Sequence, residues 1–167
     1  MTMKKTRKKK ECSAMSTVVK RVVVGVDGSP GSIAALRQGA QEAARHKALL
    51  CPIHAWAPPG GEAADAVCPA PADVRAHWQR DADGRLARAC QEAFGTVGNG
   101  ARMRPRTVRA PAGMALVAFA AQDTDVLVVG ENRHGPVHQL LHGSVSRYCL
   151  RHAHCPVLLV HSTDDET

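Results

Sequence analysis

Short apolar segments alternate along the chain with longer segments whose apolar residues recur every three or four positions. Runs rich in Val, Leu and Ile that are bounded by turn residues are typical of β-strands. The pattern predicts strands at residues 21–26, 48–55, 104–110, 125–130 and 156–161. The first, fourth and fifth are apolar at consecutive positions rather than at alternate ones. Both faces of the sheet are therefore expected to be covered, which is typical of parallel strands.

The segments between the strands have helical periodicity. They predict helices at residues 32–47, 72–94, 112–122 and 144–152. The first follows a serine that can cap its opening turn, and Trp78 and Phe94 in the second belong to an apolar stripe expected to pack in the core. Alternating strands and helices with right-handed crossovers give a single open doubly wound α/β sheet. Residues 57–72 are rich in Gly, Pro and Ala, which favours an irregular connection or a mobile flap.

The net charge of +7 is concentrated at the start of the chain. Residues 1–20 hold seven basic residues and one acidic residue, and the remainder is close to neutral. A block of like charges repels itself, so a disordered tail is expected there. A nucleic-acid-binding arm is the less favoured alternative, because such runs are unspecific, and translation from Met15 is another. The expected units are a basic tail, one domain and a short C-terminal tail, at residues 1–17, 18–163 and 164–167.

The cysteines and the hydropathy pattern point to a soluble protein of a reducing compartment. The chain has six cysteines, none in a C-x-x-C pair, and four of them lie in or directly beside predicted strands or helices. This usage is typical of small buried hydrophobic residues rather than of disulfides. No apolar run approaches the roughly 18 residues of a membrane-spanning helix. We therefore expect a cytoplasmic chain that has no membrane partner.

Two glycine-bearing loops follow predicted strands, "GVDGSPGS" at 25–32 and "GENRHGPVHQLLHGS" at 130–144. In an open α/β sheet, ligands bind beyond the carboxyl ends of the strands, where the connection order switches side. Gly143 and Ser144 begin the last helix, whose free N–H groups can hold an anion, and Asp27 can accept hydrogen bonds from a ribose or a base. These residues can equally be ordinary turn and cap residues. Neither a G-x-x-x-x-G-K-[ST] loop nor a G-x-G-x-x-G motif is present.

Three stretches resemble one known family: "VVVGVDGSPGSIAAL", "DVLVVG" and "LLHGSVSRYCLRHAHCPVLLV". Over roughly residues 18–161 the sequence is similar to a universal stress protein. The resemblance implies a flavodoxin-like, adenine nucleotide alpha hydrolase-like sheet of five strands in the order 3-2-1-4-5. It also implies a role in the stress response, a cytoplasmic location and frequent homodimers. In one branch of the family ATP binds at the crevice described above.

Members of that branch carry G-x-x-G, nine residues and then G-[ST]. In this chain Gly130 matches the first glycine, Gly143 the last and Ser144 the hydroxyl position. Arg133 stands where the second glycine is expected. Asp27 matches the acidic residue after the first strand, and Ala55 lies where the second strand passes the adenine. The resemblance thus implies a nucleotide site formed by Val26, Asp27, Gly28, Ser29, Ala55, Gly130, Arg133, Gly143, Ser144, Val145 and Ser146.

Arg133 leaves two hypotheses open. Its guanidinium can replace lost backbone contacts to phosphate, or its bulk can fill the phosphate position, and the carboxylate of Glu131 would repel a triphosphate. The chain either binds ATP or a related nucleotide, with Mg²⁺ held by the phosphates, or is a dimeric interaction module with an unidentified protein partner. No catalytic constellation is present, so at most a slow Mg²⁺-dependent ATPase activity is expected.

The remaining histidines and cysteines have simpler interpretations. His134, His138 and His142 are four residues apart, a spacing that can bind Zn²⁺, but Gly135 and Pro136 argue against one helix through all three. We favour solvent-exposed histidines. Cys155 is expected to be buried rather than a nucleophile. The last strand should lie at a sheet edge, which pairing with a second copy would protect, so we expect a homodimer through residues 156–161.

Overall fold

The structure is a computed structural model that describes residues 18–95, 102–131 and 144–161. Its strands are β1 (Arg21–Gly25), β2 (Leu49–Trp56), β3 (Arg106–Arg109), β4 (Asp125–Glu131) and β5 (Val157–His161). Its helices are α1 (Pro30–His46), α2 (Gly61–Val67), α3 (Ala72–Phe94), α4 (Ala112–Phe119) and α5 (Ser144–His152). All strand pairs are parallel, and the sheet order is β3-β2-β1-β4-β5. The predicted fold class and strand order are confirmed.

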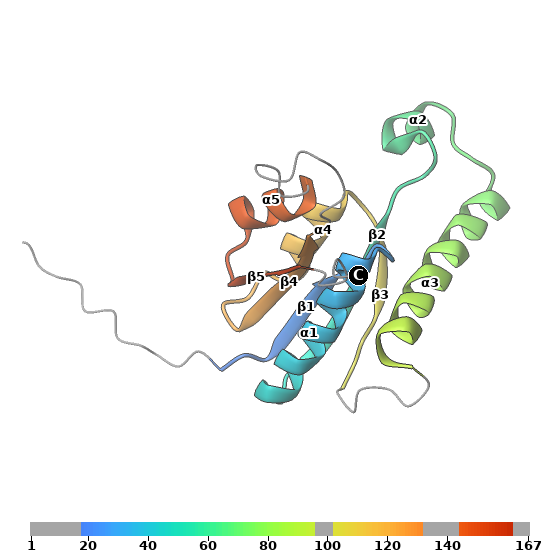
Figure 1. The fold of residues 1–167 in the computed structure, drawn as a ribbon. Coiled ribbons are helices and arrows are strands. Elements are labelled where there is room, and N and C mark those ends of the chain that lie inside the picture. The colour runs from blue at the N-terminus through green and yellow to red at the C-terminus, as the bar shows by residue number, and fades with distance from the viewer. Residues whose placement is uncertain (1–17, 96–101, 132–143, 162–167) are drawn as a thin grey trace, which may run out of the picture.

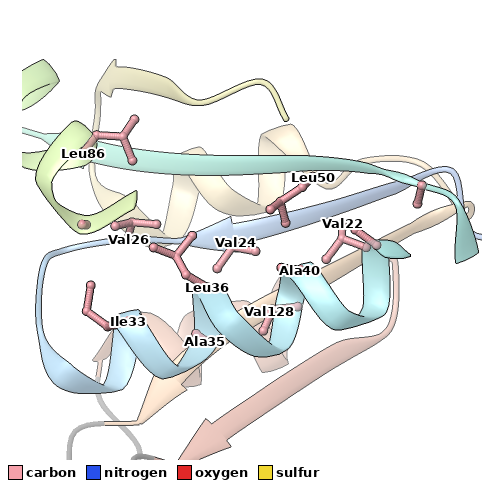
Figure 2. Close-up of a cluster of buried hydrophobic side chains, with 13 residues drawn as sticks. Val22, Val24, Val26, Ile33, Ala35, Leu36, Ala40, Leu50, Leu86 and Val128 are labelled. Atoms are coloured by element: carbon pink, nitrogen blue, oxygen red, sulfur yellow. The ribbon is translucent and has the colours of Figure 1, made fainter. Parts of the chain in front are cut away.

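Helices cover both faces of the sheet (Figure 1). On one face, α1 and α3 pack against a cluster that includes Val24 and Leu50, and Figure 2 shows Leu36 of α1 and Leu86 of α3 pointing into it. On the other face, α4 and α5 pack on the opposite side chains of the same strands. Val22, Val23 and Val24 of β1 are all 0–1% exposed, although consecutive residues point to opposite faces. This two-sided burial explains the consecutive apolar residues of β1.

Helix α1 begins two residues earlier than the predicted residue 32. Ser29 is its N-cap, and the Ser29 side chain accepts a hydrogen bond from the Ser32 N–H at 3.2 Å. Pro30 occupies the first helical position, where its missing N–H would have no partner in any case. The helix ends at Lys47, which has a left-handed conformation with φ 53°. The local capping chemistry therefore fixes where the loop after β1 turns into the helix.

Residues 57–72 are not wholly irregular, contrary to our expectation, because they contain the seven-residue helix α2. Positive φ angles at Gly60 and Gly61 make the turn into the helix, and the following Glu and Ala residues are good helix formers. Arg109 of β3 donates to the carboxylates of Glu62 and Asp65 and fastens the helix. No residue of α2 is buried, so these ion pairs are the main described contacts of the helix with the rest of the domain.

Strand β3 is shorter than the predicted 104–110. Its ladder with β2 covers four residues, from Ile53↔Arg106 to Trp56↔Arg109. Met103 forms an isolated bridge with Leu50, and Pro105 separates that bridge from the strand. Proline has no N–H to donate to a ladder, which accounts for the interruption. The edge of the sheet is therefore broken at the amino end of β3.

The amino end of the sheet is closed by an ion pair between β1 and β4. Arg21 donates to both carboxylate oxygens of Asp125, at 2.9 and 2.6 Å, and to the carbonyl of Phe119 at 3.1 Å. The N–H of Gln122 donates to the same carboxylate at 3.0 Å. This hydrogen bonding raises the pKa of Arg21. Asp125 is 1% exposed, and its buried charge is thus both paired and hydrogen-bonded.

In the part of the chain that the structure describes, no helix is both long and apolar enough to cross a bilayer.

Candidate functional site

A small hollow of about 100 Å³ lies at the carboxyl ends of β1 and β4. This is the point where the sheet order reverses direction, since β1 leads to β2 on one side and β4 leads to β5 on the other. Its wall is apolar toward α4 and polar toward the first turn of α1. The lining residues are Gly25, Val26, Asp27, Ser29, Ser32, Ala55, Ala112, Leu116, Val129, Gly130, Val145 and Ser146.

Most of the expected nucleotide-site residues that the structure describes lie together in this hollow. Val26, Asp27, Ser29, Ala55, Gly130, Val145 and Ser146 all line it. Gly28 does not line it, but its φ of 85° makes the turn between β1 and α1. Ser144 lines a separate exposed hollow on α5, beside Arg147 and Arg151. Arg133 and Gly143, like His134, His138 and His142, lie outside the described residues.

Asp27 is held by the turn that follows β1. Its Oδ1 accepts from the Ser29 N–H at 2.9 Å and from the Ser29 hydroxyl at 2.6 Å. Burial alone would raise the pKa of the Asp27 carboxyl, but hydrogen bonds from Ser29 and Ser32 outweigh it and lower the pKa. The side chain is therefore an anion with a fixed orientation. Since an ionised carboxylate has about four acceptor positions, Asp27 keeps the capacity to accept from a ligand hydroxyl.

Ser32 is a site residue that the sequence reasoning did not identify. Its hydroxyl accepts from the N–H groups of Gly28, at 3.1 Å, and of Asp27, at 3.4 Å, and donates to the Ser29 carbonyl at 3.0 Å. The amides of this loop thus point to a buried side chain rather than outward. A serine three residues after an N-cap serine was the available signal.

His54 is a second residue that the sequence reasoning missed. The residue is 7% exposed, and its Nδ1 lies 2.7 Å from the carbonyl oxygen of Val26. A carbonyl can only accept, so Nδ1 carries the proton and donates. This hydrogen bond links β2 to the last residue before the loop. A polar residue in an otherwise apolar strand, followed by Ala55 on the opposite face, was the available signal.

Gly130 occupies a position where no side chain fits. A Cβ on Gly130 would lie 2.3 Å from the carbonyl oxygen of Gly31 and 2.8 Å from the Ser32 nitrogen, both backbone atoms of α1. The Gly130 carbonyl accepts a hydrogen bond from the Ser146 hydroxyl at 3.3 Å. The end of β4 is therefore clamped between α1 and α5, and Ser146 helps to fasten it.

Glu131 does not point freely toward a phosphate position. It lies opposite His161 in the β4–β5 ladder, and its carboxylate is 2.7 Å from Nδ1 of that histidine. The side chain of Glu131 is 9% exposed. The contact with His161 therefore turns the Glu131 carboxylate toward β5, the edge strand of the sheet.

Two cysteines near the C-terminal end of the described chain lack the features of an activated nucleophile. Cys149 and Cys155 are buried, as expected for Cys155, and burial raises the pKa of both thiols, that of Cys149 to about 11. A reactive cysteine needs a lowered pKa and access. Among residues 18–95, 102–131 and 144–161, no group of His, Cys, Asp and Glu side chains could hold a metal ion.

The parallel sheet in the order β3-β2-β1-β4-β5 defines a flavodoxin-like α/β protein, and the hollow lies at the switch point where such folds bind ligands. The chain belongs to the universal stress protein family, whose model matches residues 19–161. It is 32% identical over 148 residues to universal stress protein Rv2623 of Mycobacterium tuberculosis (strain ATCC 25618 / H37Rv), an alignment that covers 86% of this chain and 48% of that protein. The chain spans about half the length of the curated relatives it matches.

Solved structures of the family share the fold. A universal stress protein from Archaeoglobus fulgidus superposes with a TM-score of 0.63 at 21% identity, covering 86% of this chain and 99% of that chain. A universal stress protein in complex with cAMP superposes with a TM-score of 0.54 at 29% identity, covering 87% and 99% of the two chains.

Proposed function

We propose that this universal stress protein binds ATP or a related adenine nucleotide in the hollow between the ends of β1 and β4. The observation that carries the proposal is the convergence on one hollow of Asp27 from the loop after β1, Ala55 from β2, Gly130 from β4 and Val145 from α5. The relative solved with cAMP supports an adenine nucleotide as the ligand class.

Each part of a nucleotide has a chemical partner in this arrangement. Val26, Ala55 and Leu116 offer apolar surface to the base, and the Asp27 carboxylate is positioned to accept from ribose hydroxyls. The phosphates extend toward the start of α5, where free N–H groups and the helix dipole favour an anion. Mg²⁺, when bound, is carried by the phosphates, and any hydrolysis is slow, because the described hollow contains no general base beyond the hydrogen-bonded Asp27.

The described hollow is large enough to enclose only part of a nucleotide. Sites for drug-sized ligands commonly have volumes of about 300–1,000 Å³, whereas the described walls enclose about 100 Å³. This observation, together with the loop amides occupied by Ser32, favours a second candidate function. In that alternative, Arg133 in place of the motif glycine abolishes nucleotide binding, and the protein is a dimeric interaction module with an unidentified protein partner.

Both candidates include a cytoplasmic homodimer that pairs through residues 156–161. β5 is an edge strand, and its residues Val157–Val160 are only partly buried in the single chain. An apolar edge strand needs protection from uncontrolled pairing. Sedimentation at micromolar concentration should detect a dimer, and a monomer would refute this part of the proposal.

Calorimetric titration of nucleotide-free protein with ATP·Mg²⁺ tests the binding proposal. We expect measurable heat for the wild type and a loss of at least tenfold in affinity for Asp27→Ala. The exposed carboxylate of Asp81 on α3 provides the matched control Asp81→Ala, which should bind as the wild type does. No heat at millimolar ATP would exclude nucleotide binding.

The Arg133→Gly variant separates the two roles of that residue. If Arg133 is a phosphate ligand, its replacement weakens ATP binding. If the guanidinium blocks the site, the wild type shows no binding and the variant gains it, which would establish the interaction module as the better description.

A further inference from the structure

A hollow of about 640 Å³ lies away from the proposed nucleotide site, at the amino end of β3. Figure 1 shows α3 running beside β3 at this edge of the sheet, opposite to β5. The groove occurs where Pro105 interrupts the pairing of β3 with β2. Its wall is mainly apolar, formed by Leu86, Ala87, Cys90, Met103, Pro105, Val108 and Phe119. Its volume lies within the common range for small-molecule sites of about 300–1,000 Å³.

The rim of this groove is cationic. Arg106 lines the groove, and Arg104 lies in the chain between the lining residues Met103 and Pro105; Arg104 and Arg106 are both exposed. Neither forms an ion pair with a carboxylate in the described part of the chain. The one acidic residue in the lining is Asp83, whose Oδ1 accepts from the Thr107 hydroxyl at 2.6 Å and from Gln79 at 2.9 Å. An apolar wall beside two unpaired guanidinium groups is complementary to a molecule with an apolar chain and an anionic end.

Two macromolecular occupants fit this groove less well. A peptide that added a strand to β3 would find only four ladder residues, preceded by a proline without an N–H. A second copy of the chain, paired edge to edge, would bring its own Arg104 and Arg106 close to these, and like charges across an interface are unfavourable.

We propose that the groove bounded by α3, Met103–Val108 and Phe119 binds a fatty acid, with its alkyl chain on the apolar wall and its carboxylate at Arg104 and Arg106. Guanidinium groups bind carboxylates through a planar fork of N–H donors. The groove is separate from the β1–β4 crevice, so this binding does not depend on the proposed nucleotide site.

Alkylation of Cys90 reports directly on the groove. The protein is treated with iodoacetamide with and without dodecanoate, below its micellar concentration, and modification is mapped by peptide mass spectrometry. We expect dodecanoate to slow alkylation of Cys90 at least fivefold and to leave the exposed Cys68 unchanged. Dodecanol, which has the same chain and no charge, should protect at least tenfold less well at equal concentration.

Charge-reversal variants test the role of the rim. The double variant Arg104→Glu/Arg106→Glu should lose at least tenfold in dodecanoate affinity by calorimetry. The double variant Arg147→Glu/Arg151→Glu on α5 has the same net charge and should bind as the wild type does. Far-UV circular dichroism and thermal melts verify that both variants are folded.

Several results would overturn the proposal. These are unchanged Cys90 alkylation with dodecanoate, equal protection by dodecanol, and equal loss in the two double variants. Protection of Cys90 that rises with protein concentration alone would show that a second copy covers the groove. Protection by anionic vesicles without any by free dodecanoate would assign it to a membrane surface.

Discussion

Replacement of Gly130 by alanine tests how the end of β4 approaches α1. The added Cβ would lie 2.3 Å from the Gly31 oxygen and 2.4 Å from the Gly31 carbon. Both are backbone atoms of the first turn of α1, so a change of rotamer cannot relieve the clash. Overpacking of this kind costs about 1–3 kcal/mol, and the upper end is expected here because the backbone itself must move. For a domain of this size, that loss of stability corresponds to a lower Tm by roughly 6–10 °C.

Two other glycines provide comparisons for the same measurement. At Gly25 the added Cβ meets the end of the Leu116 side chain at 2.8 Å, which can shift, so we expect a loss of only about 1 kcal/mol. Gly84 is within α3, and its new Cβ would be 3.3 Å from the flexible end of Arg88. Gly84→Ala should stabilise the protein by about 0.5–1 kcal/mol, because alanine favours helix.

Urea unfolding followed by circular dichroism gives the three free energies under one condition. From the most to the least stable, we expect Gly84→Ala, the wild type, Gly25→Ala and Gly130→Ala. A Gly130→Ala variant as stable as the wild type would show that β4 and α1 do not approach as described. Equal destabilisation by Gly84→Ala would show that the measurement reports a general sensitivity to substitution.

Three further predictions concern charged groups. Asp125→Asn leaves Arg21 partly buried without its anion and should destabilise the domain by on the order of 3 kcal/mol in urea unfolding; no change would refute a structural role for the pair. Arg109→Gln should speed amide hydrogen exchange in α2, which has no buried residues, and leave the unfolding midpoint nearly unchanged; unchanged exchange would show that other contacts hold the helix. The pKa of Asp27 is lowered from its ordinary value of 3.8, so its ionised form adds stability above that pH, and this stability is lost as pH falls through the lower folded pKa. Asp27→Asn should therefore lose less stability than the wild type between pH 5 and pH 3 in urea unfolding, whereas parallel pH profiles would contradict this reasoning.

The sequence predicted the elements well where burial is two-sided or periodic. The consecutive apolar residues of β1 and β4 identified central parallel strands, because both of their faces lie against helices. The predicted helix at 72–94 coincides with α3, whose long apolar stripe leaves little choice of secondary structure. The prediction from the sequence was wrong for residues 57–72. Their composition favoured a loop, whereas the ion pairs of Arg109 with α2 stabilise a helix there. Those contacts join residues more than 40 positions apart, which local composition does not reveal.

For the candidate site, Gly130 and Asp27 could be found in the sequence, since turns and strand ends are determined locally and the family pattern marks these positions. Their convergence on one hollow was decided by the order of the strands, which places β1 beside β4 in the register Val22↔Val126, although these paired residues are 104 positions apart in the sequence. Only the tertiary structure shows the hydrogen-bond partners of three polar side chains in the site. His54 pairs with the Val26 carbonyl, Ser32 with the loop amides and Ser146 with the Gly130 carbonyl. The physical reason is that a polar side chain enclosed by a fold must find a hydrogen-bond partner, and which partner is near depends on packing between distant segments of the chain.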